Sequence, residues 1–321
     1  ETRIETEEYT CSKLIIATGG LSYPGTGSTG DGYMWAEELG HTVEPCYPSL
    51  TALVPEGYKT EQSALAGEIK QAFRGKTVYG KVKERKITPL PSWYPTFEKH
   101  IERIKPLSEI GELFNGNNLE NVRLTLYING EEVQSEFGDI EFTDGGLEGP
   151  LGFMVSRRAV KALIDGQKVA VSLDLKPAVE LEKLDADVHA RWEEVIHDER
   201  SKGQPFQKLF RIMLGKLIPW NLTLAFLKTN PKVSVDTLAA SLKDWRLEIA
   251  GFVGFERCVV TAGGISTSEV VAKTLESKKQ PGLYWAGEVL DMDADTGGYN
   301  LQLAFCTGYL AGQSAAKALN E

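Results

Sequence analysis

Three glycine-containing motifs carry residue types from which a cofactor site can be built. "ATGG" (residues 17–20) ends a short apolar run, "GLYWAGE" (282–288) ends in glycine and an acid, and "DTGGYNL" (295–301) precedes a periodic apolar segment. Small residues at the end of a buried strand let a flat or phosphorylated ligand approach the backbone. A tight turn after any strand remains an equal alternative for "ATGG" taken alone.

The second and third motifs each suggest a specific chemistry. The Glu288 carboxylate, beside Gly287, could accept hydrogen bonds from the hydroxyl groups of a sugar alcohol. Gly297 and Gly298 are placed to begin a helix, where the first backbone N–H groups lack partners and the helix dipole favours negative charge. Such an end suits a phosphate, or the pyrimidine edge of a flavin, which gains electron density on reduction.

A further motif, "GTGSTG" (25–30), matches the G-x-G-x-x-G pattern of dinucleotide-binding proteins in letters only. The fingerprint needs its glycines directly after the strand. Here the preceding strand is expected to end near Thr18, and no acid follows about twenty residues later at a second strand end. The motif is therefore interpreted as a glycine-rich loop lining a flavin or substrate site.

No side chain stands out as an acid, base or nucleophile, and no metal site is predicted. Tyr299, Cys306 and Asp144 are candidates by placement only, so no catalytic residue is assigned. The four cysteines form no CxxC pair, which favours reduced thiols. The four histidines lack the spacing of metal ligands and are interpreted as surface residues: His41, His100, His189 and His197.

The elements that must position these motifs follow from the pattern of apolar residues. "KLIIATGG" (13–20) reads as a buried parallel strand, and the next segment as a helix capped by Thr29 or Asp31 and ended by Gly40. Residues 47–177 alternate as β structure, with Asn129-Gly130 as a hairpin turn. Residues 178–243 carry helical stripes, and 244–257 return to strand-like alternation.

An insertion explains this order best. We expect an α/β domain made of residues 1–46 and 258–321, interrupted by a β-barrel-like domain (47–177, with a return strand at about 244–257) and a helical subdomain (178–243). An insertion of this kind would bring the three glycine motifs together from the two ends of the chain.

Composition limits the function classes. The net charge of −10 opposes general binding to nucleic acid or anionic membranes. No stretch is long and apolar enough to span a membrane and no leader is visible, so a cytoplasmic protein is expected. Residues 59–105 nevertheless carry 11 Lys and Arg against 5 Asp and Glu. Their densest part, with Lys81, Lys83 and Lys86, indicates either a solvated hairpin or a binding surface for an acidic partner, RNA or a cofactor phosphate.

Two long segments carry a family resemblance. "ATGGLSYPGTGSTGDGYMWAEELGHTVEPCYPSLTALV" and "VTAGGISTSEVVAKTLESKKQPGLYWAGEVLDMDADTGGYNLQLAFCTGYLAG" resemble the YhiN/BaiN-like bacterial flavoproteins, a family of NAD(P)/FAD-dependent oxidoreductases, and "IEFTDGGLEGPLGFMVSR" matches more weakly. The resemblance implies a partial Rossmann-type FAD-binding domain interrupted by a β-barrel and a helical subdomain.

The resemblance also implies a set of cofactor-binding residues. The flavin-lining group would be Thr18, Gly19 and Gly20, the ribityl and phosphate group Gly287 and Glu288, and the isoalloxazine group Gly297, Gly298, Tyr299, Asn300 and Leu301.

This chain departs from the family pattern at several points. The family's N-terminal βαβ unit is absent, so the adenosine end of FAD would need a missing N-terminal segment of the same protein, and this chain alone is expected to be inactive. Asp144 and Glu148 stand where the family has His and Ser. Residues 75–117 are longer and more basic than is usual in the family.

Three hypotheses stay open from the sequence. The leading one is the C-terminal portion of an FAD-dependent oxidoreductase that exchanges hydride with NAD(P)H or a small organic substrate. The second is a nucleic-acid or protein-binding module that acts through the basic insert. The third, a flavin enzyme that modifies RNA, unites the two by analogy.

Overall fold

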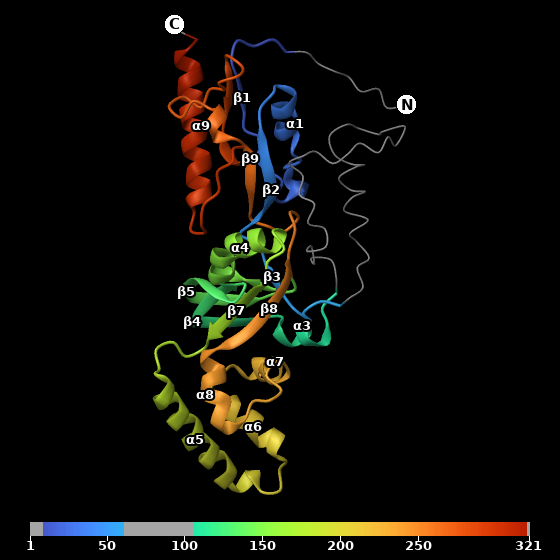
Figure 1. Ribbon diagram of the computed structural model, residues 1–321, viewed down its shortest axis with the longest axis vertical. Coiled ribbons are helices and arrows are strands. Elements are labelled where there is room, and N and C mark those ends of the chain that lie inside the picture. The colour runs from blue at the N-terminus through green and yellow to red at the C-terminus, as the bar shows by residue number, and fades with distance from the viewer. Residues whose placement is uncertain (1–8, 61–105, 320–321) are drawn as a thin grey trace, which may run out of the picture. The chain divides into compact units, whose positions relative to one another are not determined.

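The computed structural model describes residues 9–60 and 106–319, which form two compact units (Figure 1). In the described part, the first unit contains residues 9–47 and 260–319, and the second contains residues 48–60 and 106–259. Lys81, Lys83, Lys86 and His100 lie outside the described residues. The predicted domain boundaries at residues 46/47 and 257/258 stay a prediction.

The first unit is built on parallel strand pairing between the two ends of the chain. Strand β1 (Leu14–Ile16) runs parallel to β10 (Leu283–Trp285), with Leu14 opposite Leu283 and Ile16 opposite Trp285. Strands β2 (Val43–Ser49) and β9 (Val260–Ile265) form a second two-stranded sheet. Strands β9 and β10 are fully buried, whereas in β1 only Ile16 is buried and Leu14 and Ile15 are exposed. The prediction of a parallel strand here is confirmed, but its predicted burial holds only for Ile16.

Helices and turns connect these strands. Their bounds are α1 (Asp31–Glu38), α9 (Tyr299–Lys317), and the 3₁₀ turns η1 (Pro24–Thr26), η5 (Thr267–Glu269) and η6 (Gly287–Val289). The predicted side-chain cap of α1 is wrong, because Gly30 occupies the N-cap at φ 82°. The Thr29 hydroxyl instead donates to Asp31 Oδ2 at 2.8 Å, which removes both from capping.

The second unit contains a closed antiparallel barrel with strand order β3-β6-β5-β4-β7-β8. The strand bounds are β3 (Leu53–Pro55), β4 (Asn117–Ile128), β5 (Glu131–Phe142), β6 (Leu147–Glu148), β7 (Val169–Asp174) and β8 (Trp245–Phe252). The predicted hairpin turn is confirmed: Ile128 pairs with Glu131, and Asn129 and Gly130 both have positive φ. Two such residues form the mirror-image turn that fits the twist of a hairpin.

A buried cluster of aromatic side chains includes Phe142 and Trp245 of the barrel strands. Phe114 stacks on Trp245 at 5.4 Å between ring centroids, and Phe142 and Phe226 pack around them. The buried Trp245 indole donates to Thr229 Oγ1 at 2.9 Å, so its polar atom is paired. Aromatic packing of this kind adds directional preference to the burial of apolar area.

Helices complete the second unit. Their bounds are α3 (Glu109–Phe114), α4 (Gly149–Ile164), α5 (Leu181–His197), α6 (Phe206–Leu214), α7 (Thr223–Thr229) and α8 (Val235–Lys243), with 3₁₀ turns η3 (Glu199–Ser201) and η4 (Trp220–Leu222). The segment predicted to be helical holds α5 to α8, and the predicted return strand contains β8. The expected mixture of α/β structure and an antiparallel β insert is therefore confirmed.

No helix among residues 9–60 and 106–319 has the length and apolar character needed to cross a membrane.

Candidate functional site

The carboxyl ends of β1 and β10 bring two of the predicted motifs together. Because the strands are parallel, Thr18 and Gly20 follow β1 at the edge where Gly287 and Glu288 follow β10. A Cβ on Gly20 would lie only 2.5 Å from Glu288 Oε1, so no larger residue fits there without displacement. The sequence prediction that these motifs share one site is consistent with this geometry, although ligand contacts stay a prediction.

Hydrogen bonds from neighbouring residues hold the Glu288 carboxylate in place. Its Oε1 accepts a hydrogen bond from Thr261 N at 2.9 Å, and its carboxylate also interacts with the Thr261 and Ser22 side chains. Burial raises the pKa of the Glu288 carboxyl, and these hydrogen bonds oppose that shift. One carboxylate oxygen is thus fixed by the protein, which orients the group at the strand edge.

Thr261 on β9 organises the loop that follows β1. Its hydroxyl oxygen accepts from Leu21 N at 2.8 Å and from Ser22 N at 3.1 Å, and lies 2.9 Å from Ser22 Oγ. Sequence reasoning missed Thr261. The only signal was a polar residue at the start of "TAGG", within the segment assigned to the α/β domain.

Helix α9 begins after two glycines in a left-handed conformation. Gly298 is its N-cap at φ 92°, and Gly297 precedes it at φ 111°. The prediction that this glycine pair opens a helix is confirmed. Thr307 on α9 accepts a hydrogen bond from Gly287 N at 2.9 Å, which ties the helix to η6.

The three residues after the glycine pair differ in what they contact. Tyr299 and Leu301 are exposed by 62% and 64%. The Asn300 side chain turns back to the preceding loop: it donates to Ala294 O at 2.8 Å and accepts from Ala294 N at 2.8 Å. The amide of Asn300 therefore shapes the loop before α9, whereas Tyr299 and Leu301 present their side chains to solvent.

Three further titratable side chains, Tyr33, Cys46 and Asp291, interact with one another near Glu288. Burial raises the pKa of Tyr33 and, to about 12, the pKa of the Cys46 thiol, with which Tyr33 forms a hydrogen bond. Burial likewise raises the pKa of Asp291. A thiol with so high a pKa is not a nucleophile near neutral pH, so Cys46 is a packing residue.

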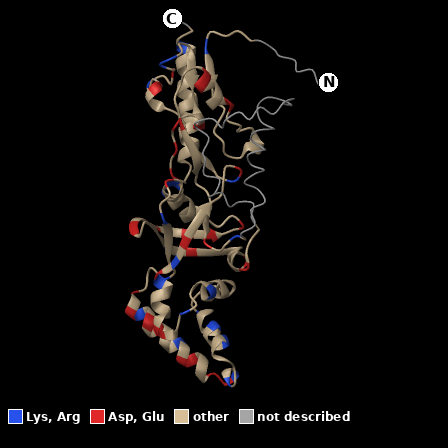
Figure 2. Cartoon of the chain, turned by 45° about the vertical axis from the view of Figure 1, so that its right-hand side comes forward, with Lys and Arg blue, Asp and Glu red and all other residues tan. Residues whose placement is uncertain are grey.

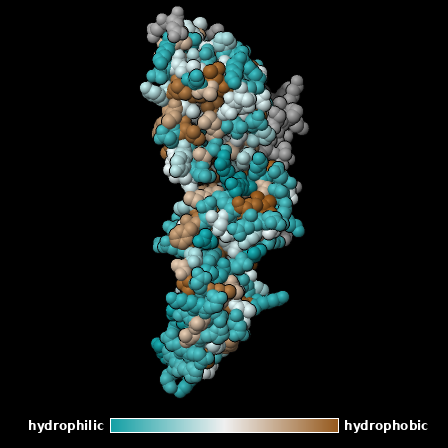
Figure 3. Space-filling view, turned by 60° about the vertical axis from the view of Figure 1, so that its left-hand side comes forward, coloured by the Kyte–Doolittle hydropathy of each residue, from teal (hydrophilic) through white to brown (hydrophobic). Residues whose placement is uncertain are grey.

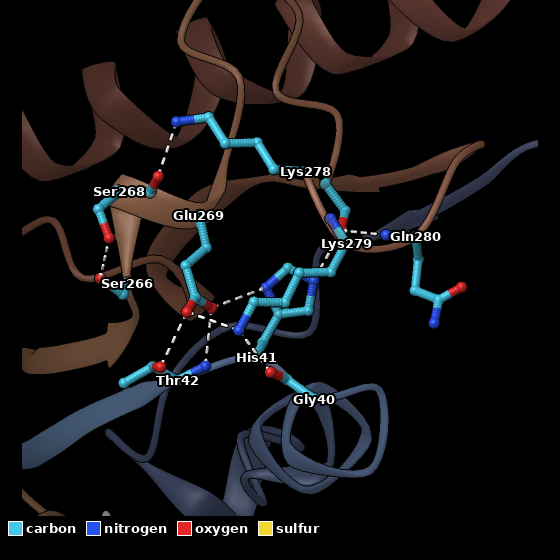
Figure 4. Close-up of polar contacts among 10 residues, drawn as sticks. Gly40, His41, Thr42, Ser266, Ser268, Glu269, Lys278, Lys279 and Gln280 are labelled. Atoms are coloured by element: carbon cyan, nitrogen blue, oxygen red, sulfur yellow. Dashed lines mark hydrogen bonds and ion pairs between the residues drawn. The ribbon is translucent and has the colours of Figure 1, made fainter.

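A second polar cluster of the same unit surrounds His41 (Figure 4). His41 Nε2 lies 2.7 Å from Ser277 Oγ, and His41 Nδ1 lies 3.3 Å from Glu269 Oε2, close enough for an ion pair but not aligned as a hydrogen bond. Glu269 also accepts from Thr42 N at 2.8 Å and pairs with Lys279 Nζ at 2.6 Å. The prediction that His41 is a surface residue is wrong, since only 4% of it is exposed.

The contacts of the His41 cluster indicate a structural role rather than a catalytic one. Ser277 Oγ accepts from Lys279 N at 3.0 Å and Gln280 N at 2.9 Å, so its proton is directed to His41 and its lone pairs are occupied. A buried serine in this state is a poor nucleophile. The cluster therefore fastens the turn after α1 to η5 and to the loop at residues 277–280.

Asp144 and Glu148, the positions that depart from the family pattern, lie in the second unit. Asp144 Oδ1 pairs with Arg257 Nη1 at 2.8 Å, and Glu148 Oε1 lies 3.6 Å from Arg257 Nη2. Burial raises the pKa of Glu148, and Arg257 opposes the shift. Among the described residues, no group of three or more His, Cys, Asp or Glu is arranged to hold a metal ion.

Comparisons with known proteins give this geometry a context. Residues 1–314 match the family described as "HI0933-like protein Rossmann domain". The chain is 27% identical over 321 residues to a 3-dehydro-bile acid delta(4,6)-reductase of Clostridium scindens, covering 98% of this chain and 64% of the relative. It is 28% identical over 309 residues to a ribosomal RNA dihydrouridine synthase of Escherichia coli, covering 96% and 62%.

A third relative points the same way. A ribosomal RNA dihydrouridine synthase of Haemophilus influenzae is 25% identical over 325 residues, covering 98% of this chain and 63% of the relative. The chain thus spans a little less than two thirds of the length of these curated relatives.

Proposed function

Because the chain belongs to the HI0933-like family of Rossmann-domain proteins, we propose that it is the flavin-facing part of an FAD-dependent oxidoreductase. One relative is named a reductase, and two others form dihydrouridine, a reduced pyrimidine. The observation that carries the proposal is the meeting of the β1 and β10 glycine motifs at one strand edge. A cytoplasmic location belongs to the same proposal.

The open backbone at two of the glycine motifs fits a flat cofactor. Gly287 (φ 79°) and Gly298 (φ 92°) have no heavy atom within 4 Å of the position that a Cβ would take. Thr18 Oγ1 is buried without a hydrogen-bond partner in the described structure, and it lies against Gly32 of α1, where a Cβ would be only 2.2 Å away.

The chain's own residues would divide the work of binding. Thr18, Gly19 and Gly20 would line the cofactor, and Gly287 would admit its ribityl and phosphate region beside the oriented Glu288 carboxylate. Gly297 and Gly298 would place the first N–H groups of α9 against an electron-rich edge. FAD, when bound, would supply hydride transfer to or from NAD(P)H or an organic substrate.

The residues at the start of α9 would then have separate roles. Asn300 would keep the loop in shape through its bonds to Ala294, while the exposed Tyr299 and Leu301 would flank the ring system. The side chain that delivers a proton to the substrate is left unassigned.

The surface of the first unit supports a further segment of the same protein as its partner. Leu14 and Ile15 on β1 are 48% and 39% exposed, and among the described residues β1 pairs only with β10. Leu301, Phe305 and Tyr309 recur every four residues along α9 and are 64–72% exposed. Apolar residues gather on the α9 side of this unit (Figure 3). A nucleotide-binding βαβ segment would cover this surface and hold the adenosine end of FAD.

A matched pair of glycine substitutions tests the site. Gly287→Ala and Gly40→Ala both add a methyl group at a backbone φ near 80°, and neither meets a neighbour within 4 Å. Both should therefore cost a similar free energy of unfolding, about 1 kcal/mol. In an FAD titration of the longer protein that includes the upstream nucleotide-binding segment, followed by flavin fluorescence, only Gly287→Ala should weaken binding. Equal affinity in the two variants would reject Gly287 as part of the site.

The division of the cofactor site needs its own measurement. FAD should bind a version of the protein that includes the upstream nucleotide-binding segment, and should bind this chain alone weakly or not at all. No affinity in the longer version would end the flavin proposal.

A further inference from the structure

The helical part of the second unit carries a local excess of positive charge. The cations between residues 202 and 232 are Lys202, Lys208, Arg211, Lys216, Lys228 and Lys232, with no Asp or Glu in that stretch, although the whole chain has a net charge of −10. Blue residues mark α6 and α7 in Figure 2, while α5 carries much of the red. The positive and negative charges of the subdomain therefore lie mainly on different helices.

An exposed tryptophan lies within this basic stretch. Trp220 in η4 is 50% exposed, and the Arg211 guanidinium carbon lies 4.3 Å from the centroid of its ring. Arg211 Nε donates to Thr223 Oγ1 at 2.9 Å, and the Thr223 hydroxyl donates to Trp220 O at 2.7 Å. Thr223 thus holds the Arg211 side chain and the Trp220 backbone in place, which lowers the entropy lost when a ligand binds.

The position of Trp220 also depends on Gly215. A Cβ on Gly215 would lie 2.6 Å from Trp220 Cε3, so the ring rests against the backbone at the end of α6. Lys208 lies one turn before Arg211 on α6 and is exposed. We call Lys208, Arg211 and Trp220 the α6 face.

The lysines around the α6 face are partly paired at the surface. Lys216 Nζ lies 2.7 Å from Glu194 Oε1, and Lys228 pairs with Glu109. Exposed pairs of this kind contribute about 0–1 kcal/mol, so a phosphate can replace the carboxylate at little cost. In the described part of the chain, the Lys208 ammonium group donates to the neutral Gln204 side chain and pairs with no carboxylate.

We infer that the α6 face binds single-stranded RNA, with Trp220 stacking on an unpaired base and Lys208 and Arg211 contacting the phosphate backbone. Aromatic platforms combined with cations along a strand are what unpaired nucleic acid requires. An acidic peptide would use the cations but leave the exposed indole without a role. The inference rests on the proposed function, for which it names RNA as the substrate class.

The test is a fluorescence-anisotropy titration of a mixed-sequence single-stranded RNA oligonucleotide into the protein at several salt concentrations. Trp220→Ala should weaken binding roughly tenfold, and Trp220→Phe should retain most of the affinity because it keeps a ring. Lys208→Ala should reduce the slope of log affinity against log salt by about 0.7, the value for one phosphate contact on a single strand.

Lys183→Ala is the matched control. Lys183 is an exposed lysine on α5 of the same subdomain, so its loss changes the net charge equally. It should leave both affinity and salt slope unchanged. If Lys183→Ala and Lys208→Ala weaken binding equally, or if Trp220→Ala has no effect while thermal unfolding stays normal, the α6 face is not the RNA site.

The two proposals fail in different ways. Anisotropy needs no flavin, so RNA binding that depends on Trp220 supports the inference even if FAD titrations fail. Flavin binding without any RNA affinity overturns the inference and leaves the oxidoreductase proposal in place. Reduction of a steroid by a protein that binds no RNA would likewise overturn it.

Discussion

Two glutamates of the first unit each accept a hydrogen bond from the backbone N–H of a threonine, but their pKa values shift in opposite directions. Glu288 accepts from Thr261 N at 2.9 Å, and Glu269 accepts from Thr42 N at 2.8 Å. The pKa of Glu288 is raised by burial, whereas the pKa of Glu269 is lowered to about 2 although burial opposes that shift. A backbone hydrogen bond therefore does not decide the direction in which the pKa of a glutamate shifts.

The neighbours make the difference. Glu269 has Lys279 Nζ at 2.6 Å and receives the Thr42 hydroxyl at 2.9 Å. Glu288 has hydroxyl groups and the charge of Asp293 nearby, and no cation pairs with it among the described ion pairs. The contacts around Glu269 stabilise the fold, whereas Glu288 has no cationic partner among the described residues and lies at the edge proposed to bind the cofactor, and such perturbed acids are common at functional sites.

Among the substitutions that test this comparison, Gly20→Ala should have the largest effect on the free energy of unfolding. Its Cβ would lie 2.5 Å from both Glu288 Oε1 and Thr261 Oγ1, so the strand edge must move. We expect a loss of about 3 kcal/mol in the free energy of unfolding, as for overpacked cores, together with loss of FAD binding. Chemical denaturation measures this loss of stability. Gly25→Ala is the control, because no heavy atom lies within 4 Å of the position that its Cβ would take. Equal stability of the two variants would mean that the edge is not tightly packed.

Glu269→Gln should have the next largest effect. The Glu269 pKa is about 2 in the folded protein against an ordinary 4.5, so its stabilisation is present above pH 4.5 and is lost as pH falls toward 2. The variant should lose about 2 kcal/mol at pH 7, because charged hydrogen bonds and an ion pair are weakened. Denaturation curves at pH 7 and pH 3 should differ less for the variant than for the native protein. A constant difference between the two proteins at both pH values would contradict this account.

Glu288→Gln should have a smaller effect of opposite sign. A raised acid pKa means that stability is lost as pH rises from 4.5 through the folded value, so the buried charge costs free energy at pH 7. The glutamine can still accept from Thr261 N, so the variant should be more stable by about 1 kcal/mol at pH 7. Thermal unfolding at pH 7 and pH 4 checks the sign. A clear destabilisation at pH 7 would show that the charge itself supports the fold.

Local patterns predicted those parts of the molecule whose partners lie close in the chain. Asn129-Gly130 predicted a hairpin because the required backbone conformation belongs to those two residues. Gly297 and Gly298 predicted the start of α9 for the same reason. The cap of α1 was wrong because three neighbouring residues could take the position, and the Thr29–Asp31 contact decided in favour of Gly30.

Contacts between distant segments could not be predicted. The interior position of His41 depends on Glu269 and Ser277, more than two hundred residues away. Thr261 meets Leu21 and Ser22 in the same way. A single histidine or threonine gives no sign of such a partner, because its side chain suits a solvated surface and a paired interior equally well.

The parallel pairing of β1 with β10 has a consequence for the order of folding. Leu14 and Leu283 can pair only after almost the whole chain has been brought into a closed loop, whereas Ile128 and Glu131 pair across a two-residue turn. Closing long loops is entropically unfavourable and slows folding. The pairing of Leu53 with Phe252 closes the barrel and shortens that loop. We therefore expect the barrel to form first and to bring the two ends of the chain closer together. The strand edge with Glu288 is then expected to form last.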